Sequence, residues 1–170
     1  MHKSVTTLSA GVTAGVLLAL AGAAQASTKS DSFQVSATVT KNCVIDAPDL
    51  NLGIFDGTNN LVATSTISVR CTTGTTFDVD LSTGSSASYA TRTLVNGTDV
   101  LNYNLYTTGA YTTVWGDGTG STGRVSGTGT GMGAAAAQSL TVHGRLLASN
   151  NLAPVPAGSY VDNLIATITY

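Results

Sequence analysis

The sequence predicts an all-β protein folded as an antiparallel sandwich. About seven short runs alternate apolar and polar residues and are separated by Gly, Asn and Pro, a pattern typical of strands joined by turns. No stretch combines a helical apolar period with helical length. Only 9% of the residues are charged, Glu is absent, and Thr, Ser and Gly fill the polar positions, which favours a pleated surface over helices.

The N-terminus has the features of a secretory signal peptide. A basic start at Met1-His2-Lys3 is followed by an apolar run over 12–24 and by the small-x-small site Ala24-Gln25-Ala26. The best apolar core, Val16–Leu20, is too short to favour spanning about 30 Å of hydrocarbon. We therefore expect residues 1–26 to be removed, and the mature chain to form one domain without a transmembrane segment.

The charge balance argues against a nucleic-acid partner. The whole chain has a net charge of −2, and without Lys3 six Lys and Arg remain against nine Asp. No basic cluster is available to neutralise phosphates.

The first predicted strand of the mature chain covers 32–40. Its apolar residues recur at a spacing of two and would share one face of an extended chain, with polar residues on the other face. These apolar residues are Phe33, Val35, Ala37 and Val39. The spacing leaves open whether this face packs in its own molecule or in another.

Two cysteines remain in the mature chain, and an exported protein with an even number most simply pairs them. A Cys43–Cys71 disulfide would stabilise the fold by about 3.6 kcal/mol through loop closure. Two cysteines with one remote His do not form a zinc site, and no Cys-x-x-Cys redox motif is present.

Later strands follow from the same alternation. Ser65–Cys71 and Phe77–Leu81 are joined by Thr72–Thr75, which predicts a tight hairpin with the two strands side by side. Asn96-Gly97 predicts a two-residue turn. Further strands are predicted at Leu101–Tyr106, at Ser139–Leu147 and in the C-terminal run, where Leu164, Ala166, Ile168 and Tyr170 share a face. The Gly-rich tract 116–133 predicts short strands and surface loops.

Candidate chemical groups lack the companions that catalysis needs. His143 has no nucleophile motif, and a strand-surface histidine is the favoured interpretation. Asp78 and Asp80 share a strand face and are best explained as solvated side chains. Gly118–Gly123 has the glycine spacing of a phosphate loop without the following Lys, and so predicts a surface loop. We expect no enzymatic activity, no cofactor and no metal site.

Several motifs together resemble the spore coat protein U domain family, which includes subunits of archaic, Csu-type chaperone-usher pili. The resemblance covers residues 33–170. It is carried by the alternating stretch before Asn42-Cys43, Leu50-Asn51-Leu52-Gly53, Cys71-Thr72-Thr73-Gly74-Thr75, Leu101-x-Tyr103-x-Leu105-Tyr106, Trp115-Gly116-Asp117-Gly118, and Gly158-x-Tyr160-x-Asp162 leading into Thr167-x-Thr169-Tyr170.

The resemblance implies an incomplete immunoglobulin-like sandwich at 43–170 that is completed by donor-strand complementation, with 27–42 as the donor segment. Phe33, Val35, Ala37 and Val39 would enter the groove of a neighbouring subunit. Leu164, Ala166, Ile168 and Tyr170 would line the acceptor groove and contact the chaperone. The expected partners are other pilus subunits, a periplasmic chaperone and an outer-membrane usher, on a route through the periplasm to the cell surface. The length favours a rod subunit serving adhesion and biofilm formation.

Two other functions stay open from the residues alone. One is a monomeric secreted or coat-associated adhesin, or a carbohydrate-binding module, with Trp115 and Tyr111 in its site. A lone Trp is more often buried in a sandwich than exposed as a sugar platform. The other is a secreted hydrolase that uses His143.

Overall fold

The computed structural model describes residues 25–170, so most of the predicted signal peptide lies outside the described residues. The chain divides into two units, 1–37 and 38–170. Residues 25–42 contain no helix or strand, and every regular element of the described chain lies after them. No helix in the described part is long and apolar enough to cross a membrane.

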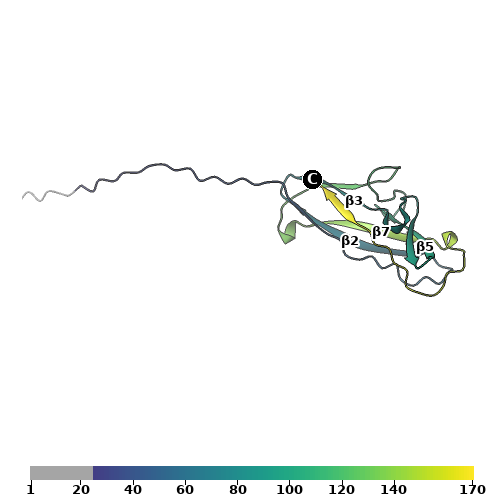
Figure 1. Ribbon diagram of the computed structural model, residues 1–170. Coiled ribbons are helices and arrows are strands. Elements are labelled where there is room, and N and C mark those ends of the chain that lie inside the picture. The colour runs from purple at the N-terminus through teal and green to yellow at the C-terminus, as the bar shows by residue number, and fades with distance from the viewer. Residues whose placement is uncertain (1–24) are drawn as a thin grey trace, which may run out of the picture. The chain divides into compact units, whose positions relative to one another are not determined.

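Within residues 25–170, eight strands form two antiparallel sheets, which confirms the predicted all-β class. The five-stranded sheet has the order β1 (Cys43–Asp46), β2 (Leu61–Cys71), β7 (Gln138–Leu146), β5 (Asp99–Tyr106) and β4 (Arg92–Asn96). The three-stranded sheet has the order β6 (Val125–Thr128), β3 (Thr76–Leu81) and β8 (Ala166–Thr169). Figure 1 shows the yellow C-terminal strand beside β3, with β2 and β7 together in the other sheet. Three short 3₁₀ turns cover Gly84–Ser86, Ala134–Ala136 and Ala148–Asn150.

The core lies between the two sheets because alternate residues of each strand face inward. Val69 of β2 and Val79 of β3 are fully buried, and both belong to one apolar cluster with Val142 and Leu146 of β7. Trp115 is also fully buried, and its Nε1–H donates to the Val79 carbonyl at 2.8 Å. The favoured prediction of a buried Trp is confirmed.

The predicted hairpin between the second and third strands is wrong. β2 and β3 are consecutive but belong to different sheets. Near its C-terminal end β2 already pairs with β1 on one edge and β7 on the other, so no edge is left for β3. Thr72–Thr75 therefore carries the chain across the sandwich, where the Gly74 N–H donates to the Gly129 carbonyl at 2.8 Å.

The Asn96-Gly97 turn is confirmed. β4 and β5 form a hairpin whose last pair is Asn96 and Asp99, and Gly97 has a φ of +62°. Glycine adopts this left-handed conformation without a steric cost, which is why the signal is reliable.

The last strand is shorter than its apolar run, because the preceding residues cross between the sheets. Val161 exchanges backbone hydrogen bonds with Val95 of β4, in the five-stranded sheet. Four residues later the Ser82 N–H donates to the Ile165 carbonyl at 2.9 Å, beside the start of β8 in the other sheet. The ladder with β3 begins only at Ala166.

Candidate functional site

Each sheet has two edge strands, β1 and β4 in the five-stranded sheet and β6 and β8 in the three-stranded sheet, and the edges at β1 and β8 lie on the same side of the sandwich. β8 pairs with β3 alone, and β1 pairs with β2 alone, so each ends its sheet within the described chain. β1 and β8 lie next to each other. Their outer edges leave backbone N–H and C=O groups free for a further strand.

Half-buried apolar side chains accompany these edges. Cys43 and Ile45 of β1 pack against the core but are not fully covered, and the same holds for Leu164 and for Ala166 and Ile168 of β8. Complete burial of such side chains requires another layer of chain. The structure thus brings three of the four predicted acceptor residues together beside the open edges.

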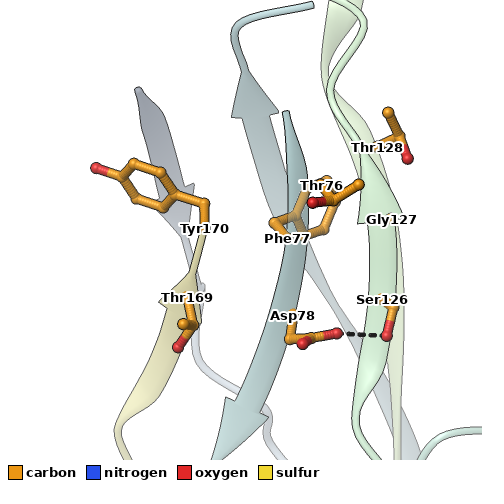
Figure 2. Close-up of a pocket in the computed structure, with 8 residues that line it drawn as sticks. All are labelled: Thr76, Phe77, Asp78, Ser126, Gly127, Thr128, Thr169 and Tyr170. Carbon is orange, nitrogen blue, oxygen red and sulfur yellow. Dashed lines mark hydrogen bonds between the residues drawn. The ribbon is translucent and has the colours of Figure 1, made fainter. Parts of the chain in front are cut away.

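Tyr170, the fourth predicted acceptor residue, is 51% exposed and is not part of the packed apolar cluster. It lines a shallow pocket of about 500 Å³ over the three-stranded sheet. Figure 2 shows its ring directed away from β3 and Phe77. The pocket is lined by Thr76, Phe77, Asp78, Ser126, Gly127, Thr128, Thr169 and Tyr170.

The two acidic residues of β3 are already paired. Arg124 lies 3.5 Å from Asp78 and 3.2 Å from Asp80, and the Ser126 hydroxyl also donates to Asp78 (Figure 2). Burial raises the pKa of Asp80, and Arg124 opposes that shift. One guanidinium therefore contacts both carboxylates and offsets one of their two negative charges, as expected for a structural surface cluster.

A larger cleft of about 870 Å³ is lined by chain that follows β1 and chain that precedes β8. Its lining includes residues 51–57 and 151–160, with Leu61, Leu94, Leu101 and Leu146 from the five-stranded sheet. Leu50 and Leu52 lie over Gly144 of β7, where an added Cβ would come within 3.0 Å of Leu50. The sequence pattern did not predict this cleft; the one signal was a glycine inside a strand.

The apolar side chains of the N-terminal stretch are not buried in this chain. Phe33, Val35 and Val39 are 87%, 83% and 84% exposed, and Ala37 is exposed as well. No strand includes them. The strand predicted at 32–40 is therefore not formed within this chain.

The Cys43–Cys71 disulfide predicted from the sequence is present. Its residues lie directly opposite each other in the β1–β2 ladder, with Cα atoms 4.1 Å apart. The bond fastens the short β1 to the neighbouring β2 while leaving the outer edge of β1 unpaired.

The predicted chemical candidates are not assembled into a catalytic site in the described chain. His143 lies on β7, and its ring makes an edge contact with Tyr111 at 6.4 Å. No carboxylate or Ser hydroxyl is hydrogen-bonded to it within residues 25–170. Among the same residues no three His, Cys, Asp or Glu side chains are grouped to hold a metal ion.

Comparison with known proteins agrees with this architecture. The family model described as Spore Coat Protein U domain matches residues 29–167. The chain belongs to this family. That result confirms the assignment that the motifs indicated. No curated protein matches the chain.

A solved structure shares the fold. It is the crystal structure of the CsuC-CsuE chaperone-tip adhesion subunit pre-assembly complex from archaic chaperone-usher Csu pili of Acinetobacter baumannii. The match has a TM-score of 0.56 and 22% identity, and it covers 78% of this chain. The chain spans 40% of the length of the matched chain. The likeness supports the immunoglobulin-like sandwich of the family.

Proposed function

We propose that this protein is a structural rod subunit of a chaperone-usher surface pilus, without enzymatic activity. The observation that carries the proposal is the pair of unpaired edges at β1 and β8, with half-buried Ile45, Ala166 and Ile168 between the sheets. The same chain carries an exposed alternating segment suited to fill such an opening. Each subunit donates residues 33–39 to the next.

Strand addition accounts for both affinity and specificity. A strand inserted beside β8 forms backbone hydrogen bonds along its free edge, and alternate side chains enter the apolar groove. Burial of Phe33, Val35, Ala37 and Val39 contributes roughly 5 to 10 kcal/mol, and each net backbone hydrogen bond adds about 1 kcal/mol. An interface of this strength holds a fibre together without covalent bonds.

The partners follow from the same edge. An unpaired strand next to an apolar groove aggregates unless it is covered, so a periplasmic chaperone occupies it before assembly. An outer-membrane usher then exchanges the chaperone for the next subunit. The fibre at the cell surface serves attachment and biofilm formation. The chaperone complex in the similar structure supports this part of the proposal.

The test compares substitutions on the two faces of the donor segment. Val35→Asp together with Val39→Asp places two charges on the apolar face, and we expect fibres to disappear from electron micrographs of the cell surface. The matched control, Ser36→Asp with Thr38→Asp, charges the opposite face and should retain assembly. Equal fibre formation by both double variants would contradict the proposal.

The monomeric carbohydrate-binding alternative loses its main stacking residue, because Trp115 is fully buried.

A further inference from the structure

An aromatic and cationic cluster lies where β5 and β7 pair. Tyr106 of β5 is opposite His143 of β7, Arg145 is two residues further along β7, and Tyr111 comes from the loop after β5. The Arg145 guanidinium lies 5.1 Å from the Tyr106 ring centre and 4.6 Å from that of Tyr111. The two Tyr rings meet edge to face at 5.4 Å.

This guanidinium has no anionic partner. Both ion pairs of residues 25–170 involve Arg124, and the one side-chain hydrogen bond of Arg145 within these residues runs from Nη2 to the Tyr106 hydroxyl at 3.4 Å. Its Nε–H is buried and has no acceptor. The two Tyr rings stabilise the positive charge through cation–π contacts, but they accept no hydrogen bonds in the plane of the guanidinium. The N–H groups of Arg145 therefore lack the carboxylate whose geometry they match.

The surrounding surface favours an anion that also carries hydroxyl groups. On β2, Val62 is opposite Arg145 and Thr64 is opposite His143. The positions of β2, β7 and β5 that share the face of Arg145 include no acidic residue, although the whole chain has a net charge of −2.

The loop that brings Tyr111 to Arg145 contains an energetically unfavourable backbone conformation at Tyr111. Tyr111 has a φ of +56°, a left-handed conformation that non-glycine residues rarely adopt. Such outliers persist only where the surroundings impose them, and they gather at binding sites. All four side chains of the cluster are partly exposed, so a ligand can reach them.

We propose that Tyr106, Tyr111, His143 and Arg145 form a binding site for a saccharide that carries a carboxylate. Arg145 receives the carboxylate with two N–H groups, while His143, Thr64 and the Tyr hydroxyls bind sugar hydroxyls. A single fixed cation among aromatic and hydroxyl groups suits a sugar acid better than a polyphosphate or a lipid surface, which require several cations. β5 and β7 are interior strands of their sheet, so the site is separate from the open edges and goes beyond the pilus function.

The test measures binding of the full chain, immobilised, to oligogalacturonate and to sialyllactose by biolayer interferometry. Fully methyl-esterified oligogalacturonate and lactose are the matched neutral ligands. At least one acidic sugar should bind at least about tenfold more tightly than its neutral counterpart. The neutral sugar lacks the carboxylate and therefore cannot form the paired charge-assisted hydrogen bonds with the Arg145 guanidinium. Equal binding of acid and neutral forms, or binding of neither acid at millimolar concentration, would overturn the proposal.

Variants then assign the site. Arg145→Gln should weaken acid binding at least about tenfold, while Arg70→Gln, on β2 of the same sheet, should leave it unchanged. Fluorescence of the buried Trp115 reports whether each variant is folded. If Arg145→Gln does not fold, Arg145→Lys replaces it as the test. Lysine keeps the positive charge but lacks the paired N–H donors of the guanidinium, so this variant should bind the acidic sugar more weakly than the wild type. Unchanged binding by either folded Arg145 variant also contradicts the site.

Discussion

Tyr103 shows how one buried polar residue fixes the course of the chain. Its ring belongs to the core, and its hydroxyl donates to Asp162 Oδ2 at 2.8 Å. Asp162 also accepts hydrogen bonds from the Ser85 N–H and hydroxyl, both at 2.8 Å. Burial, and then the bond to Asp162, raise the pKa of Tyr103 well above its ordinary value of 10.0. These contacts fasten the crossing segment before β8 to β5.

This pairing predicts a loss of stability at alkaline pH. The folded-state pKa of Tyr103 is higher than the unfolded one, so its contribution is complete below about pH 10 and declines as the pH rises further. Tyr103→Phe should lower the free energy of unfolding by about 1 to 2 kcal/mol at pH 7 and should weaken its decline between pH 10 and 11.

Urea unfolding curves across pH 7 to 11 measure both effects. Tyr160→Phe is the control, because the Tyr160 hydroxyl donates to the exposed Pro156 carbonyl. If the free energies of unfolding of Tyr103→Phe and the wild type fall in parallel above pH 10, folding does not raise the pKa of Tyr103, and the prediction is contradicted.

At the scale of the element, β1 depends on the disulfide for its place in the sheet. It has four residues, pairs on one edge only, and is covalently joined to β2 at Cys43–Cys71. A short edge strand has few hydrogen bonds to resist fraying. The disulfide therefore holds one of the two open edges in position.

Removal of the disulfide should destabilise the domain and loosen β1. We expect Cys43→Ala with Cys71→Ala to lower the free energy of unfolding by about 3.6 kcal/mol, from the lost constraint on the unfolded chain. Guanidinium unfolding measures the free energy, and hydrogen exchange at Val44 and Ile45 reports fraying. The wild type with reductant should approach the double variant, and unchanged unfolding in both would contradict this role.

At the scale of the whole molecule, the exposed N-terminal stretch and the sandwich should differ in resistance to protease. Lys29 and Lys41 are exposed in a stretch without strands, whereas Arg92 is fully buried. Proteases cut exposed, unpaired chain far faster than packed strands. Trypsin should therefore cut the unassembled chain first at Lys29 and Lys41.

Assembly should change that order under the proposed strand donation. Lys41 follows the donor residues 33–39 directly, so we expect its cleavage to slow at least about tenfold in fibres, because cleavage needs local opening. Mass spectrometry of timed digests measures both sites, and Lys29 serves as the internal reference. Equal rates at Lys41 before and after assembly would show that the segment stays free.

Local signals explain which parts of the fold could be predicted. Two of these signals depend on neighbouring residues: the Asn96-Gly97 turn and the alternation of β2 and β3. A third depends on the chemistry of one residue type, the cysteines Cys43 and Cys71. The fully buried Arg92 was not predicted, because its acceptors are the Ser82 and Trp115 carbonyls and the Asn104 side chain, which only the fold brings together. The cluster around Arg145 was missed for the same reason, although the sequence suggested Tyr111 and His143 separately, each for a different function.

By itself the sequence determined the strand content, the disulfide and the family, because period-two alternation, turn chemistry and cysteine pairing act locally or through composition. Only the tertiary structure decided that β2 and β3 part into different sheets, since the edges of β2 are taken by β1 and β7. It also decided that β1 and β8 end their sheets unpaired. Alternation specifies which residues share a face, whereas the competition of strands for a limited number of edges specifies what covers it.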